Sequence, residues 1–69
     1  MRFITFVSDK NTEYCYNAET IQRVSWHKGS GIINIDVRDT SYTHFFNNSE
    51  SAELTYNNII KMLKGEIKE

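Results

Sequence analysis

Three side chains in this chain are of the types that bind transition metals: Cys15, His27 and His44. Each lies in a stretch with strand character, so the three could meet across a sheet, and three such ligands can hold zinc. No two of them lie within a few residues of each other, and none of the spacings is that of a zinc motif. We therefore interpret them as ordinary strand residues and expect no metal and no other cofactor.

The same residues could serve nucleophilic catalysis, in which a histidine activates a cysteine and a third group orients the histidine. Cys15 would pair with His27 or His44. Asp36 or Asn34 would orient the imidazole. Cys15 lies between two tyrosines in the middle of an expected strand, a position more typical of a packed thiol than of a reactive one. The pattern favours a structural cysteine.

A pair of carboxylates is another arrangement that can do acid–base chemistry. Asp36 could form such a pair with Asp39 or with Glu13. Surface carboxylates near arginines, here Arg23 and Arg38, are more typical of cross-strand ion pairs. A chain of 69 residues also leaves little volume for an enclosed pocket. We therefore predict that the protein is not an enzyme.

Aromatic side chains give the strongest indication of function. There are nine, comprising four Phe, four Tyr and one Trp, and one helix cannot cover so many on a small sheet. Leftover apolar surface on a small domain marks an interaction site. The alternative is that these rings form the core or a dimer interface, where aromatic side chains dominate the packing energy. The candidate binding surface comprises Tyr14, Tyr16, Trp26, Tyr42, Arg23 and Lys28.

The hydrophobic pattern predicts the strands that must position these residues. The segment 32–38 alternates Ile33, Ile35 and Val37 with polar residues, which is the period of a strand with one buried face. Two glycines just before it mark a tight hairpin turn. A turn or a single helical turn is expected after the second strand. Strands are predicted at about 2–8, 12–18, 21–28, 31–38 and 41–46.

One helix is predicted over about 50–64, capped by Asn47 or Ser49 and ended by Gly65. Its apolar residues recur at steps of three and four, and residues 66–69 are expected to form a frayed tail. The predicted fold is α+β, a single domain over 1–69. It consists of an antiparallel β-meander of about five short strands followed by one C-terminal amphipathic helix packed on the sheet. The face opposite the helix is expected to be partly apolar, because the first strand carries apolar residues on both faces.

Charge and size narrow the classes of partner. Eight basic residues face nine acidic ones, so the chain lacks the basic footprint of a dedicated nucleic-acid binder. A domain this small has a marginal core and gains from a partner subunit, so a homo-oligomer is expected, with a dimer favoured. The N-terminal apolar run is too short for a signal peptide and no segment is long enough to span a membrane. We expect a cytoplasmic protein with no membrane partner.

These observations lead to two hypotheses about function. The first is a small non-enzymatic protein-interaction or regulatory module that self-associates through an aromatic sheet face or an edge strand. The alternative is a single-stranded nucleic-acid-binding protein that stacks bases on its aromatic rings. The second hypothesis predicts a steep loss of affinity with salt, and the first does not.

Overall fold

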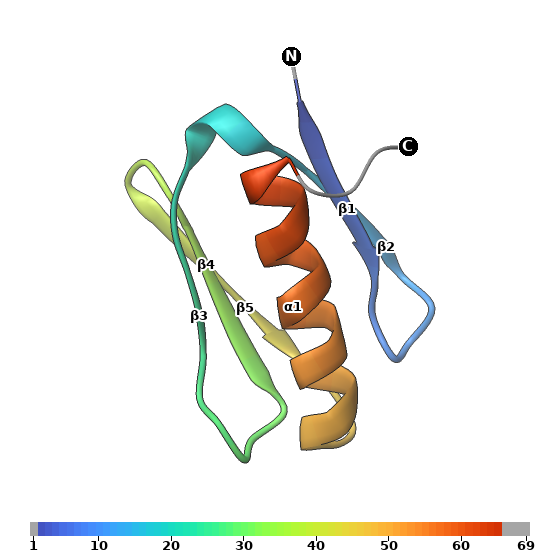
Figure 1. Ribbon diagram of the computed structural model, residues 1–69. Helices are drawn as coiled ribbons and strands as arrows, with labels where there is room; N and C mark the ends of the chain where they lie inside the picture. The colour runs from blue at the N-terminus through green and yellow to red at the C-terminus, as the bar shows by residue number, and fades with distance from the viewer. Residues whose placement is uncertain (1, 66–69) are drawn as a thin grey trace.

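The computed structural model describes residues 2–65, and the tail expected at 66–69 lies outside them. Five strands precede one helix in the order of the chain (Figure 1). This confirms the predicted α+β class. The elements are β1 (Phe3–Val7), β2 (Glu13–Asn17), the 3₁₀ turn η1 (Ala18–Thr20), β3 (Ile21–Trp26), β4 (Ile32–Val37), β5 (Thr40–Phe45) and α1 (Ser49–Lys64).

The strands are divided between two antiparallel sheets. β1 pairs with β2, and β3, β4 and β5 form a three-stranded meander. The division falls at η1, where Asn17 Oδ1 accepts a hydrogen bond from the Glu19 backbone N–H and the Thr20 hydroxyl donates to the Asn17 carbonyl oxygen. These short-range bonds fix a helical turn in place of a hairpin. The chain therefore leaves the first sheet after β2 and begins a new one at β3.

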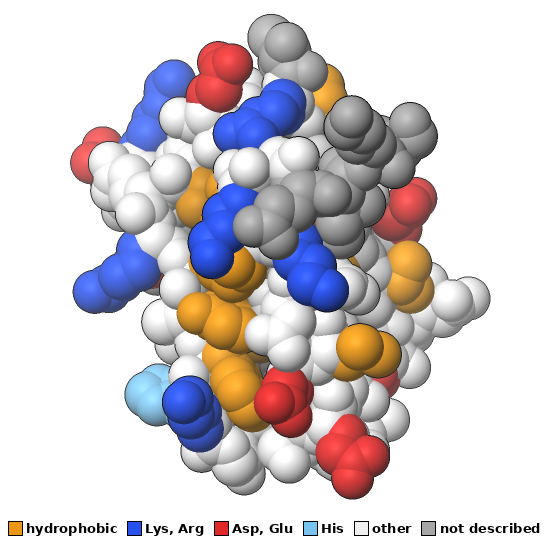
Figure 2. Space-filling model, in the orientation of Figure 1, with side chains coloured by type: hydrophobic (Ala, Val, Ile, Leu, Met, Phe, Trp, Pro, Cys, Tyr) orange, Lys and Arg blue, Asp and Glu red, His pale blue; other side chains and the backbone are white. Residues whose placement is uncertain are grey.

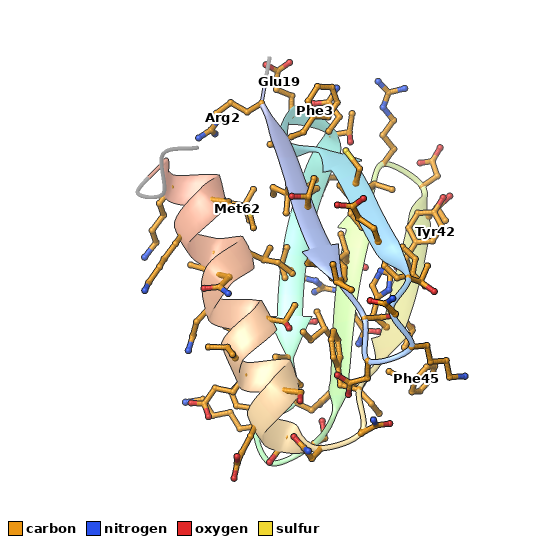
Figure 3. All side chains as sticks on the ribbon, turned by 90° about the vertical axis from the view of Figure 1, so that its right-hand side faces the viewer. Arg2, Phe3, Glu19, Tyr42, Phe45 and Met62 are labelled. Atoms are coloured by element: carbon orange, nitrogen blue, oxygen red, sulfur yellow. The ribbon has the colours of Figure 1, made fainter. Side chains whose placement is uncertain are left out.

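The two sheets face each other, and α1 closes one of the two open sides between them (Figures 1 and 3). The helix contacts β1, β3 and β4. It therefore packs beside β1 and against the face of the three-stranded sheet at β3 and β4. The core lies where the three layers meet and comprises Ile4, Phe6, Ala18, Ile33, Ile35, Phe46, Ala52 and Ile59.

Specific caps hold both ends of α1. The side chain of Asn48 accepts a hydrogen bond from the Ser51 backbone N–H at the N-terminus, so the cap is Asn48 and neither of its two neighbours predicted from the sequence. At the C-terminus Gly65 adopts a left-handed φ of 76°, as predicted for a helix stop. Arg2 also donates from Nη1 to the carbonyl oxygen of Met62 at 3.4 Å, which ties the start of β1 to the end of the helix.

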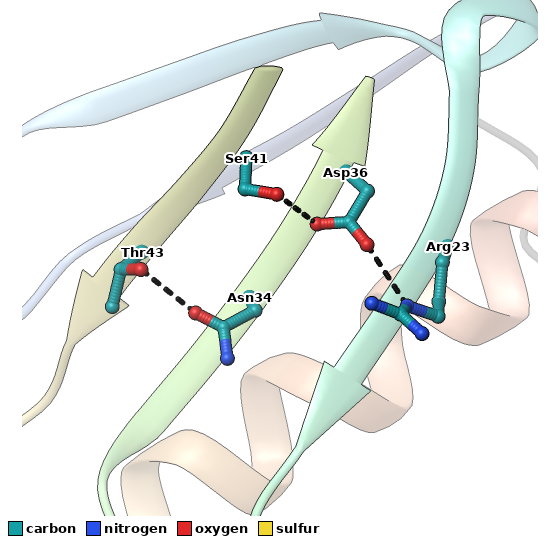
Figure 4. A network of polar contacts seen from close by, with 5 residues as sticks. All are labelled: Arg23, Asn34, Asp36, Ser41 and Thr43. Atoms are coloured by element: carbon teal, nitrogen blue, oxygen red, sulfur yellow. Dashed lines mark hydrogen bonds and ion pairs between the residues drawn. The ribbon is translucent and has the colours of Figure 1, made fainter. Parts of the chain in front are cut away.

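The expectation of a partly apolar face opposite the helix holds only in part for the three-stranded sheet. Its outer face carries a polar network (Figure 4), in which Asp36 accepts from Arg23 Nε at 2.8 Å and from the Ser41 hydroxyl at 2.6 Å. The Thr43 hydroxyl donates to Asn34 Oδ1 at 2.8 Å beside it. The two-stranded sheet explains the error, because it buries apolar surface that the helix alone could not cover. The apolar part of this face includes Phe45, with 70% of its surface exposed, and its ladder partner Ile32.

Gly31 is predicted to be essential to the packing of the β5–α1 connection. Its carbonyl accepts from the Phe46 N–H at 2.7 Å, and a Cβ at Gly31 would collide with the Phe46 carbonyl oxygen. Gly31→Ala should therefore lower the free energy of unfolding by about 3 kcal/mol, measured by urea denaturation. Gly29→Ala is the control, since it meets only open space and carries the left-handed backbone cost of about 1 kcal/mol. Equal losses in the two variants would contradict this account.

Candidate interaction site

A cluster of four rings joins the two sheets on the side opposite α1. Phe6 of β1 stacks on Tyr14 and Tyr16 of β2, with ring centroids 5.4 and 6.2 Å apart. His44 of β5 meets all three edge-on, with centroids 5.1 Å from Phe6, 4.5 Å from Tyr14 and 5.8 Å from Tyr16. Tyr42 extends the cluster to the surface at 5.9 Å from Tyr16, and Figure 3 shows it on this side of the molecule.

A hydrogen bond at the centre of the cluster links the Tyr16 hydroxyl to Nε2 of His44 at 2.5 Å. Burial raises the pKa of Tyr16 to about 12, with smaller contributions from Tyr42 and Tyr14, so the phenol keeps its proton at neutral pH. Burial lowers the pKa of His44 below its ordinary 6.5, so the imidazole is neutral there. The hydroxyl can therefore donate to Nε2.

The outer edge of β5 carries unpaired backbone groups. Phe46 N–H bonds to the Gly31 carbonyl, and hydrogen-bonded and non-bonded pairs alternate along an antiparallel ladder. The groups that point away from β4 are therefore the N–H and C=O of Ser41, Thr43 and Phe45. Within residues 2–65 none of these groups has a backbone partner outside the ladder.

The same reasoning identifies the free groups of β2. Ala18 N–H bonds to Arg2 and Ser8 N–H to Thr12, so the ladder with β1 turns the backbone of every second residue of β2 outward. Those residues are Glu13, Cys15 and Asn17. The Asn17 carbonyl already accepts a hydrogen bond from the Thr20 hydroxyl, so fewer backbone groups are free at that end of β2.

These two edges flank a groove, which we call the β2–β5 slot. Most Cα atoms of β2 lie more than 8 Å from those of β5, and the two strands share no backbone ladder. The groove has a volume of about 400 Å³. A smaller hollow of about 140 Å³ adjoins it near the β1–β2 turn and is lined by Lys10, Thr43 and Phe45 among others. The groove is lined by Tyr14, Cys15, Tyr16, Asn17, Thr20, Val37, Tyr42 and His44.

Of the six residues predicted to form a binding surface, the structure brings together three. Tyr14, Tyr16 and Tyr42 line the β2–β5 slot. Trp26 lies on the α1 side of the molecule, where its ring centroid is 5.9 Å from that of Tyr56 and its Nε1–H donates to the Ser30 carbonyl at 2.8 Å. The aromatic residues are thus divided between two places instead of forming one exposed sheet face.

The two basic residues of the predicted surface lie elsewhere. Arg23 is on the polar outer face of the three-stranded sheet, with 74% of its side chain exposed and its charge paired with Asp36. The hydrogen bond from Ser41, followed by the interaction with Arg23, lowers the pKa of the Asp36 carboxyl. Lys28 is exposed in the turn between β3 and β4. Neither cation adjoins the tyrosines of the β2–β5 slot.

The residues considered for metal binding or nucleophilic catalysis are not gathered into one site. Cys15 is exposed at the edge of β2, His27 is exposed after β3, and His44 is buried with 7% of its surface accessible. Over residues 2–65 there is no group of three or more His, Cys, Asp or Glu side chains that could hold a metal ion. In the same part of the chain no helix has the length and apolar character needed to cross a membrane.

The face that carries α1 presents a mixed surface (Figure 2). Lysine, arginine and acidic side chains are interspersed there, and a band of hydrophobic side chains runs along the boundary between α1 and β3. Partly buried Trp26 and Tyr56 belong to the elements on the two sides of this boundary. The band is therefore the visible rim of the helix–sheet packing.

Comparison with known proteins gives no assignment: no family model, no curated protein and no solved structure matches this chain. Function must therefore be argued from the site itself. Sequence reasoning missed His44 as the centre of the ring cluster. Its place between Tyr42 and Phe46 on the alternating face of a strand was the signal that it points inward.

The buried, neutral His44 is predicted to make stability depend on pH. Its folded pKa is lower than that of the unfolded chain, so protons bind preferentially to the unfolded state below about pH 6.5. The stabilising effect is complete above that pH and is lost as the pH falls below it. The urea midpoint of the wild type should therefore drop between pH 7.5 and pH 5.

A matched pair of variants assigns that pH dependence. His44→Phe should flatten the dependence, because it keeps an aromatic ring and removes the titrating group. His27→Gln should leave it as in the wild type, since His27 is exposed. A wild-type slope that persists in His44→Phe would place the titrating group elsewhere.

Proposed function

We propose that this protein is a non-enzymatic protein-interaction module that binds its partner by strand pairing at the open edges of β2 and β5. The observation that supports this most directly is that β2 and β5, which both contribute residues to one groove, each have an unpaired edge, while α1 packs against β1 and β3. Unpaired backbone groups on a sheet edge form a template for another strand. The backbone groups of these edges can thus bind a partner strand without any recognition motif in the side chains.

The edge strands lack the devices that normally prevent such pairing. Proteins block exposed edges with charged residues, proline or bulges. The segment 40–45 of β5 contains no charged residue, β2 contains only Glu13, and the chain has no proline. The one register shift in the ladders lies between β3 and β4, away from these edges. The lack of such protective features supports the proposal that these edges pair with a partner strand.

The aromatic sheet face considered from the sequence has less support as the interaction surface. Its tyrosines pack against Phe6 and His44 inside the chain, and Trp26 packs against Tyr56. Base stacking has no favourable arrangement either, because Arg23 is paired with Asp36 and lies away from the rings. Self-association, expected as a dimer, is then proposed to use the edge strands.

Light scattering at low and high salt tests this proposal. We predict a dimer whose mass is insensitive to salt, because backbone pairing is not screened by ions. Thr43→Pro should shift the mass toward that of a monomer, because it removes a free N–H from the β5 edge and leaves the ladder with β4 intact. Thr43→Ala is the matched control, since it loses the same side chain and keeps the N–H. A dimer unaffected by Thr43→Pro would place the interface elsewhere.

A titration with a single-stranded oligonucleotide, followed by Trp26 fluorescence, tests the alternative function. We expect no saturable change at moderate salt. Binding that weakens steeply with added salt and is reduced by Arg23→Ala or Lys28→Ala would favour nucleic-acid binding over the proposed function.

A further inference from the structure

We propose that the partner of the β5 edge is a second copy of this chain, and that the two β5 strands pair antiparallel about a two-fold axis at Thr43. This inference rests on the proposed function and specifies the partner, the edge and the register. The pairing would join the two three-stranded sheets into one continuous sheet, with three strands from each copy. It uses the edge of β5 and not that of β2.

β5 is the more accessible of the two open edges. Five of its six residues are exposed, whereas three of the five residues of β2 are half-buried. The backbone groups of Ser41, Thr43 and Phe45 point outward, and within residues 2–65 none of them has a backbone partner. On β2, the Asn17 carbonyl already accepts from the Thr20 hydroxyl. An approaching strand therefore meets more free groups on β5.

The charge of β5 allows an identical strand to face it. The segment 40–45 contains no Asp, Glu, Lys or Arg, so two copies meet without repulsion between facing residues. Lys10 lines the hollow beside Phe45. An axis at Thr43 separates the two Phe45 residues by roughly 13 Å along the strands, beyond the Debye length of about 10 Å at 0.1 M salt. Each copy uses the same edge, so association stops at a dimer.

The positions of the outward groups define the register. A hydrogen-bonded antiparallel pair needs an outward residue on both strands. With Thr43 opposite the partner's Thr43, Ser41 lies opposite the partner's Phe45, and every outward N–H of these residues meets an outward C=O. A shift by two residues would leave one outward residue of each strand without a strand partner. The register at Thr43 therefore makes the most hydrogen bonds.

The same register covers the two exposed aromatic side chains of β5. Tyr42 lies opposite the partner's His44 in a non-hydrogen-bonded pair, in which Cα atoms approach to about 4.5 Å. Phe45 lies opposite the partner's Ser41 on the other face of the sheet. In the single chain Tyr42 is 46% exposed and Phe45 is 70% exposed. Both side chains would lose exposed apolar surface on pairing, which favours association.

Nuclear Overhauser contacts between chains test the register in the wild type. In a mixture of isotope-labelled and unlabelled protein, the Hα of Tyr42 should contact the Hα of the partner's His44, because the Hα atoms of a non-hydrogen-bonded pair face each other. A contact between the two Tyr42 residues, or between the two His44 residues, would overturn the register at Thr43. Either result would leave the proposed function standing.

Amide hydrogen exchange, measured by NMR at several protein concentrations, tests the edge. At a total chain concentration about 45 times the dimer dissociation constant, about a tenth of the chains are monomeric. Exchange at Ser41, Thr43 and Phe45 should then be about tenfold slower than in dilute solution. The outward amide of Cys15 on β2 is the internal control and should not change. Protection at Cys15 instead of β5 would overturn the inference in favour of the β2 edge, with the proposed function still standing.

A pair of charged variants tests the position of the axis. Thr43→Lys and Thr43→Glu each place like charges opposite each other, whereas an equimolar mixture places opposite charges there. The mixed dimer should be about tenfold tighter than either homodimer at low salt, measured by analytical ultracentrifugation. Mixing Ser41→Lys with Ser41→Glu is the matched control and should give no such gain, because the two residues lie on opposite sides of the axis. No gain with the Thr43 variants would overturn the axis.

The wild-type measurements keep the inference testable if a charged variant fails to fold. Protection of the β5 amides together with the Tyr42–His44 contact between chains supports the inference. A wild-type mass that stays monomeric at every concentration would overturn both the inference and the self-association on which it rests.

Discussion

On the side of the molecule away from α1, the two sheets are held together by rings instead of backbone hydrogen bonds. His44 is the central member: it touches Phe6 from the first strand and both tyrosines of the second, and its Nε2 is bonded to the Tyr16 hydroxyl. Edge-to-face ring pairs add roughly 0.5–1.5 kcal/mol each beyond their burial. The polar tip of a buried histidine must also be satisfied, which the tyrosine does. The relative position of the sheets depends on this contact.

The same arrangement explains why the edges of β2 and β5 remain open. Rings that fill the space between the sheets keep the backbones of these strands too far apart to bond directly. On the opposite side α1 buries Ala52 and Ile59 and packs against β1 and β3. One side of the fold is therefore closed by a helix. The other is closed by side chains alone, which leaves the backbone groups accessible.

Local features of the fold were readable from the sequence, whereas the assembly of the sheets was not. The alternation of Ile33, Ile35 and Val37 and the glycines around the β3–β4 turn predicted the strands correctly, because these are short-range constraints. The sequence also predicts a turn or a single helical turn at η1, and the structure has a 3₁₀ turn there. That it would separate two sheets was not predicted, since pairing beyond a hairpin depends on contacts distant in sequence. The residues of the predicted binding surface are separated in the structure for the same reason. Trp26 and Tyr16 both lie in strands with a similar alternation of apolar and polar residues, but they pack on opposite sides of the core.

The 3₁₀ turn also has a consequence for the order in which the chain folds. Every backbone ladder closes within one hairpin, so little loop-closure entropy opposes its formation, and each sheet is a local unit. The bond from Arg2 to the Met62 carbonyl spans 60 positions and belongs to a later stage, when the first hairpin meets the helix. The groove between the sheets can form only once these units have docked. Its geometry therefore depends on the docking contacts, of which those between His44 and the rings of the first sheet are a part.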